Sequence, residues 1–159
     1  MDAPPRTYGL AAPEQTAGKS GREILQAIID GELPAPPMAE TLRFWLAEVG
    51  DGYAAFEGET GPHILNPHGT VHGGWAMTLI DSATGCAAHT LLEAGAKYTT
   101  VETKVNFSRP ILADTGRVRA EAHVVNKGRQ IISAECRLVD AAGKVLAHGT
   151  STLMVLSRP

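Results

Sequence analysis

The residues best suited to catalysis lie in one stretch, HGTVHGGWAMTLIDSATGCAAHT, from His68 to Thr90. Asp81 stands near its middle in an apolar run, and the stretch contains no Lys or Arg. A carboxylate among apolar side chains has to be paired or face a cleft. Asp81 therefore either caps a helix that restarts just after it, or acts as a general base or nucleophile.

The triplet His72-Gly73-Gly74 opens this apolar run. Glycines where a loop meets a helix let another molecule approach the backbone closely. The first N–H groups of a helix have no intrahelical partner and carry partial positive charge, so they can bind an oxyanion. An isolated His-Gly-Gly is more often an ordinary turn, but Asn66 upstream and Asp81 downstream strengthen the catalytic interpretation.

The spacing of Gly73 and Asp81 sets a limit on any such site. A helix that begins near Gly73 places Asp81 about 12 Å further along its axis, at 1.5 Å per residue. One small carbonyl group cannot contact both in the same chain. Either one of the two residues is catalytic, or the site joins Gly73 of one subunit to Asp81 of another.

Three histidines, at positions 63, 68 and 72, raise the alternative of a metal site. His68 and His72 have the spacing of a helical zinc pair. Pro67 and Gly69 break any helix across the pair, and the cluster includes no Asp, Glu or Cys. We therefore expect no metal.

Composition limits the other functional classes. The 159 residues are 43% hydrophobic, which suits one globular domain, and the net charge of −3 with 5% aromatic residues argues against a nucleic-acid partner. No apolar run reaches the roughly 20 residues that span a membrane, and the N-terminus has no secretory pattern. Cys86 and Cys136 lack metal-type spacing. We expect a cytoplasmic protein with two buried thiols.

The order of elements predicts an α+β fold. Residues 1–37 form a flexible N-terminus with a short helix capped by Ser20 and a Pro-rich linker, ahead of a domain over 38–159. TLRFWLAEV and YAAFEGET form a hairpin, the stretch around Asp81 forms a buried helix, and four strands follow. In TVETKVNF, strict alternation puts Val101, Thr103, Val105 and Phe107 on one face.

Strand segments RVRAEAHVV and QIISAECRLV alternate in the same way, with short turns that indicate an antiparallel sheet. A curved sheet around one long helix leaves a sheet face and an edge to cover, so we expect a homo-oligomer.

The motif NPHGTVHGGWAMTLIDSATGCA, followed by TTVETKVNFSRP, resembles the hot-dog fold acyl-CoA thioesterases of the PaaI-like (phenylacetate-pathway) branch. The resemblance extends over about residues 38 to 156. It implies a curved antiparallel sheet wrapped around a central helix, and hydrolysis of a thioester to a carboxylic acid and free coenzyme A. It also implies sites built across a dimer interface, in a homodimer or homotetramer, with no cofactor beyond the coenzyme A of the substrate.

Matching positions imply the following roles. Asp81 is the catalytic acid, the Gly73 N–H binds the thioester oxygen with support from His72, Asn66 orients substrate or water, and Thr100 positions the attacking water. Gly74 and Trp75 are candidates for binding substrate, with the bulky Trp75 indole expected to narrow or line the acyl pocket, and Arg109, Lys127 and Arg129 are candidates for binding the coenzyme A nucleotide. Taken singly, each of these basic residues is more often part of a solvated turn.

One position departs from related branches. Relatives that use Glu as the acid often carry Ser or Thr four residues later, where this chain has Gly85. A non-catalytic acyl-CoA sensor and a hot-dog hydratase or dehydratase stay open as alternatives. The acyl group preferred by the protein does not follow from these patterns.

Overall fold

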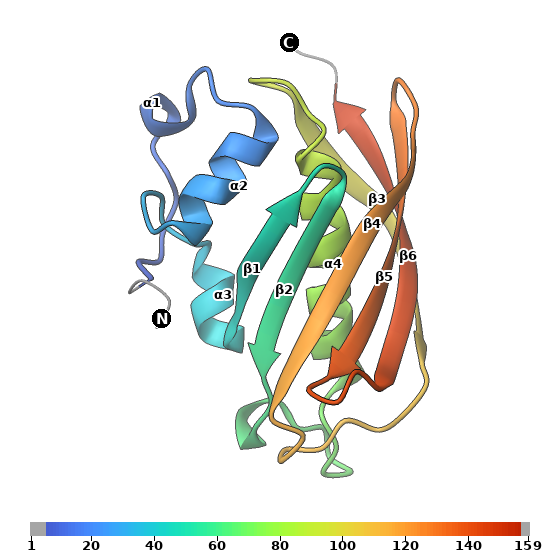
Figure 1. Ribbon diagram of the computed structural model, residues 1–159. Helices are drawn as coiled ribbons and strands as arrows, with labels where there is room; N and C mark the ends of the chain where they lie inside the picture. Colours follow the sequence, from blue (N-terminus) through green and yellow to red (C-terminus); the bar gives the residue numbers. More distant parts are fainter. Residues whose placement is uncertain (1–5, 157–159) are drawn as a thin grey trace.

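A single six-stranded antiparallel sheet curves around one long helix in the computed structural model, which describes residues 6–156 (Figure 1). The strand order is β1-β2-β4-β5-β6-β3. The strands are β1 (Phe44–Gly50), β2 (Tyr53–Glu59), β3 (Lys97–Phe107), β4 (Arg117–Lys127), β5 (Ile131–Asp140) and β6 (Val145–Leu156). The helices are α1 (Pro13–Thr16), α2 (Gly21–Ile29), α3 (Pro37–Leu42) and α4 (Gly73–His89), with a 3-10 turn η1 (Pro62–Ile64). This arrangement is the hot-dog fold that the sequence predicts.

Helix α4 is the centre of the core. It packs against every strand of the sheet, and most of its residues between Trp75 and Ala88 are buried. Small side chains line it, and Ala76, Ala83 and Ala87 are at most 1% exposed. They allow the sheet to approach the helix backbone closely, so α4 has little freedom to shift along its axis.

The predicted alternation is confirmed in β4 and β5. Val118, Ala120 and Ala122 of β4 are at most 1% exposed, and Ile132 and Leu138 of β5 are fully buried. Their neighbours along each strand point away from α4, to the outer face of the sheet.

The predicted alternation of β3 is wrong at Val101. The pairing of β3 with β6 shifts register between Thr100 and Glu102, and Val101 is 59% exposed. A bulge adds one residue to a strand and reverses which side chains face the core. Tyr98 and Thr100 before the bulge, and Thr103 and Val105 after it, are therefore the partly buried residues of β3.

The N-terminal segment has more regular structure than the sequence predicts. The Ser20 cap is confirmed, since the Ser20 side chain accepts from the Glu23 N–H and Glu23 reaches back to the Ser20 N–H. The sequence predicts that the first strand begins at Thr41, but Thr41 and Leu42 belong to helix α3, whose start at Pro37 is favoured because proline suits the first turn of a helix. The expected boundary between residues 37 and 38 thus falls inside α3.

Thr7 and Gly9 are hydrogen-bonded to Ala35, which ties the start of the described segment to the rest of the chain. Tyr8 forms a bridge with Ala35, and Leu25 of α2 belongs to the same hydrophobic core as α4. Figure 1 shows α1, α2 and α3 gathered beside β1. The part of the expected flexible segment that falls on residues 1–5 lies outside the described residues.

Within residues 6–156, no helix is long and apolar enough to cross a membrane.

Gly21 at the start of α2 packs directly against the end of α4, and this contact can be tested by its contribution to stability. A Cβ at Gly21 would lie 1.9 Å from the backbone oxygen of His89, and the Gly21 N–H donates to Leu92 O at 3.0 Å. Gly21→Ala has to displace α2 from the end of α4. We expect it to lower the free energy of unfolding by about 1–3 kcal/mol in urea titrations.

Gly50→Ala is the matched control, because its Cβ would meet Tyr53 at an ordinary 3.5 Å. Equal unfolding midpoints for the two variants would contradict the packing described for α2.

Candidate active site

Asp81 lies in the middle of α4, on the side that faces β3. The helix runs without interruption from Gly73 to His89, so the interpretation of Asp81 as the cap of a restarted helix is wrong. The carboxylate is half-buried, and its Oδ1 accepts a hydrogen bond from Thr103 Oγ1 at 3.0 Å. Among the described residues, Oδ2 has no hydrogen-bond partner. One oxygen is anchored and the other is open to react.

The N-terminus of α4 presents one free donor. His72 is the N-cap residue, and its Nδ1 accepts from the Gly74 N–H at 2.9 Å. Within the part of the chain that the structure describes, the Gly73 N–H has no such partner. Gly73 lines a hollow of about 360 Å³ together with Phe107 and Arg109. The cap therefore occupies the Gly74 donor and leaves that of Gly73 for an oxyanion.

Two independent estimates of the distance between Gly73 and Asp81 within one chain agree. Along α4 the separation is about 12 Å. Along β3, Thr103 contacts Asp81, whereas the Phe107 ring lies 3.0 Å from where a Gly73 Cβ would be. Four residues of strand at about 3.3 Å each again give about 13 Å. A single chain does not bring the free N–H and the carboxylate onto one carbonyl group.

Asn66 has a structural task in the loop before α4. Its Oδ1 accepts from the backbone N–H groups of His68 and Thr70, and its Nδ2 donates to Thr70 Oγ1 at 2.8 Å. Gly69 adopts a φ of +80° there, which favours glycine. These bonds shape the loop that leads into the His72 cap. The expected contact of Asn66 with substrate stays a prediction.

Sequence reasoning selected Thr100 in β3 and missed Thr103. The hydroxyl that contacts Asp81 is that of Thr103, and the register of β3 with β6 shifts between the two threonines. Strict alternation does show Thr103 on one face of β3, but not that this face meets Asp81. The role expected for Thr100 stays a prediction.

Trp75 is only 4% exposed, and its indole Nε1 donates to Leu42 O at 2.8 Å. It lines a second hollow, of about 340 Å³, with Gly74 and Thr78. The ring is anchored in the core between α4 and β2, where a Cβ at Gly58 would lie 2.8 Å from it. Trp75 can therefore form one wall of a binding pocket without moving.

The three candidate basic residues fall at opposite ends of α4. Arg109 lies beside Gly73 and donates to Val145 O, whereas Lys127 donates to Leu91 O beyond the other end of the helix. Arg129 lies in the exposed turn after β4. One chain cannot place all three on the same phosphate group, since α4 is about 25 Å long.

The remaining polar groups do not form a rival centre in residues 6–156. Burial raises the pKa of the Cys86 and Cys136 thiols to about 12, so both are protonated at neutral pH and neither is a ready nucleophile. No group of three or more His, Cys, Asp or Glu side chains in these residues is arranged to hold a metal ion.

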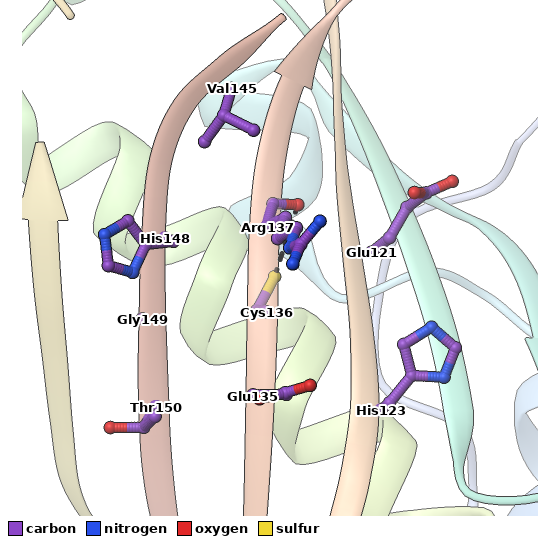
Figure 2. A pocket seen from close by; sticks show the side chains of 9 residues that line it. All are labelled: Glu121, His123, Glu135, Cys136, Arg137, Val145, His148, Gly149 and Thr150. Atoms are coloured by element: carbon purple, nitrogen blue, oxygen red, sulfur yellow. Dashed lines mark hydrogen bonds between the residues drawn. The ribbon is translucent and has the colours of Figure 1, made fainter. Parts of the chain in front are cut away.

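A broad hollow of about 670 Å³ lies on the outer face of the sheet (Figure 2). Its lining includes Glu121 and His123 of β4, Glu135 of β5 and His148 of β6, with α4 behind the strands. The sheet separates this hollow from Asp81.

Comparison with known proteins identifies the family to which this fold belongs. The model of the family described as "Thioesterase superfamily" matches residues 68–147, which include His72, Gly73 and Asp81. The chain belongs to the thioesterase superfamily. Its expected place among the PaaI-like hot-dog thioesterases is confirmed by solved structures of that group.

Three relatives illustrate the similarity. The protein of Saccharolobus solfataricus named "Putative esterase SSO2140" is 35% identical over 88 residues, which are 55% of this chain and 61% of that protein. The phenylacetic acid degradation protein PaaI of Thermus thermophilus, solved as a variant, is 32% identical with a TM-score of 0.68 over 76% of this chain and 99% of that chain. The conserved protein PA5202 of Pseudomonas aeruginosa is 25% identical with a TM-score of 0.72 over 92% and 100%. The match thus spans less than two thirds of the S. solfataricus protein.

The His72 cap can be tested by its stability contribution. His72→Ala removes the side-chain acceptor of the Gly74 N–H, and we expect the free energy of unfolding to fall by about 1 kcal/mol. His72→Asn retains a capping acceptor, and we expect its free energy of unfolding to lie within about 0.5 kcal/mol of that of the native protein. Denaturant titrations of both variants measure the difference, and equal losses would show that His72 does not cap α4.

Proposed function

We propose that this thioesterase hydrolyses acyl-CoA in a site that combines Asp81 of one subunit with the Gly73 N–H of another. The observation that carries the proposal is the pair of unused groups on α4: the Oδ2 of an anchored carboxylate and a free N–H at the helix N-terminus. These are the two functions that thioester hydrolysis needs.

The chemistry follows from the two groups. Water adds to the thioester carbonyl carbon as Asp81 Oδ2 takes its proton, and the Gly73 N–H stabilises the oxyanion that forms. When the intermediate collapses, the C–S bond breaks and the proton passes to the thiolate, which leaves as free coenzyme A. Direct attack by Oδ2 on the carbonyl carbon, followed by hydrolysis of the anhydride, uses the same open oxygen. An oxyanion donor contributes about 3 kcal/mol, and a base about a hundredfold in rate.

The exposed edge of the sheet supports a homo-oligomer. Strand β3 ends the sheet, and on its outer side it pairs with no other strand in residues 6–156. Val101 and Phe107 on this strand are 59% and 53% exposed. A long unpaired edge strand that exposes apolar side chains is a typical site of pairing between copies. In our proposal, twofold pairing there has its axis between Thr103, which contacts Asp81, and Phe107, which lies beside Gly73. Such pairing reverses the direction of the second α4 and brings its Asp81 toward the first Gly73.

The same arrangement accounts for the basic residues. Arg109 lies at the Gly73 end of α4 and lines the hollow beside the free N–H. In our proposal it binds a phosphate of coenzyme A, and any contribution of Lys127 or Arg129 comes from the other end of a neighbouring α4. The cytoplasmic location expected from the sequence is part of the proposal.

Asp81→Asn tests the acid. The amide keeps the shape of the side chain but cannot accept a proton from water, so we expect thiol release to fall at least a hundredfold. A free-thiol assay over aryl-, short-, medium- and long-chain acyl-CoA measures turnover, and size-exclusion chromatography checks that the oligomer is intact. Undiminished turnover of the best substrate by the variant would contradict the role of Asp81.

The same substrate panel separates the proposal from its alternatives. Tight binding of acyl-CoA by the native protein without thiol release would indicate a sensor, and hydration of an enoyl-CoA without thiol release would indicate a hydratase.

Gly73→Pro tests the oxyanion donor, because proline has no N–H. Residue 73 is the first helical position, which accepts proline, and His72 already has the extended backbone that a following proline requires (φ −62°, ψ 130°). We expect a loss of about a hundredfold in kcat. Gly73→Ala is the control, since it retains the N–H and meets only the movable Phe107 ring. Equal kcat values for these variants would exclude the Gly73 N–H as the donor.

A further inference from the structure

A row of three hydroxyl groups extends from Asp81 into the core. Thr103 Oγ1 lies 3.0 Å from Asp81 Oδ1, Ser151 Oγ lies 3.0 Å from Thr103 Oγ1, and Thr84 Oγ1 lies 2.8 Å from Ser151 Oγ. Thr103 belongs to β3, Ser151 faces it from β6, and Thr84 lies one turn after Asp81 in α4. Three separate elements thus supply one continuous row.

Burial makes this row unusual. Thr84 is fully buried and Ser151 is 2% exposed, in a region otherwise packed with apolar side chains. A buried hydroxyl costs free energy unless it is hydrogen-bonded, and apolar residues of similar size would fill the same space at lower cost. The row therefore requires an explanation beyond packing.

The direction of donation follows from proton counting. Each hydroxyl has one proton, and an ionised carboxylate can only accept, so Thr103 donates to Asp81. Thr103 must then accept from Ser151, which uses the only proton of Ser151. Thr84 Oγ1 lies 3.0 Å from Ile80 O, 3.1 Å from Asp81 O and 2.8 Å from Ser151 Oγ, and because Ser151 has no proton left for this shortest contact, Thr84 donates to Ser151. All three O–H bonds point toward Asp81, and such head-to-tail rows strengthen each bond in them.

We propose that Thr84, Ser151 and Thr103 form a hydroxyl chain that positions the Asp81 carboxylate and reserves its Oδ2 for the reaction. This inference rests on the proposed function and adds to it the residues that orient its acid. The chain supplies from β3 and β6 the support that a Ser or Thr at position 85 would supply within the helix. The polypeptide has Gly85 at that position, where an added Cβ would lie 2.9 Å from the Tyr98 hydroxyl.

The experiment compares kcat and KM for Thr103→Val, Thr103→Ser, Ser151→Ala and the double variant Thr103→Val/Ser151→Ala. We expect Thr103→Val to lower kcat by about tenfold or more with KM within about twofold, because a bond to a charged group is lost. Thr103→Ser restores the donor and stays within about threefold of native kcat.

The double variant separates positioning from packing. Ser151 acts on Asp81 only through Thr103, so Ser151→Ala lowers kcat in the native background but causes no further loss in Thr103→Val. Losses that multiply, or a Thr103→Val protein with native kcat, would overturn the proposal. Thr90→Val is the matched control: its buried hydroxyl bonds to Ala87 O and the Gly52 N–H, so its loss affects stability and not kcat.

Two further measurements keep this proposal distinct from the proposed function. If Asp81→Asn is inactive while Thr103→Val is fully active, the hydroxyl-chain proposal is wrong and the role of Asp81 as the catalytic acid is retained. If the native protein releases no thiol from any substrate, the proposed function is wrong. The hydroxyl chain can then still be tested by proton NMR, which needs no substrate. Asp81→Ala is then expected to shift the hydroxyl resonances of Thr103, Ser151 and Thr84 together. A shift confined to Thr103 would overturn the chain.

Discussion

The fixed rise of α4 keeps the free N–H of Gly73 about 12 Å from the carboxylate of Asp81, and the surrounding sheet prevents either from moving. Ala76, Ala83 and Ala87 are at most 1% exposed beneath the strands, and Gly149 of β6 lies so close that an added Cβ would contact the backbone of β3 and Ile80 of α4. A helix packed this tightly cannot bend to close the gap. The proposed division of the site between subunits follows from this rigidity.

The same rigidity benefits the chemistry. The side chains that hold the acid, Thr103 and Ser151, come from strands that pack on α4 and pair with each other. The free N–H is held by the His72 cap and by the loop that Asn66 shapes. Each proposed reactive group is therefore oriented by bonds within its own subunit, before the second subunit of our proposal completes the site. Such preorganisation is the main source of electrostatic catalysis.

Much of this could be predicted from sequence, where local pattern and tertiary structure agree. The alternation of β4 and β5, the Ser20 cap and the start of a buried helix at Gly73 each depend on residues close in the chain. The family motif also identifies Asp81 and Gly73 as candidate catalytic residues.

The remaining features depend on contacts between distant segments. The bulge at Val101 arises from pairing with β6, and it decides that Thr103 reaches Asp81. Helix α3 has a local start signal in Pro37, but its extension through Thr41 and Leu42, against the strand pattern there, depends also on packing against β1. The hydroxyl chain joins positions 84, 103 and 151, and no local pattern connects them.

The central claim is that Gly73 and Asp81 of different subunits form one site, and subunit mixing tests it most directly. Gly73→Pro and Asp81→Asn proteins, each inactive alone, are mixed under conditions that exchange subunits, and thiol release is measured. If the site spans two subunits, a mixed dimer contains one site with both native residues, so random exchange restores about a quarter of native activity. If each site lies within one chain, every site has a defect and the mixture stays inactive, which would contradict the account.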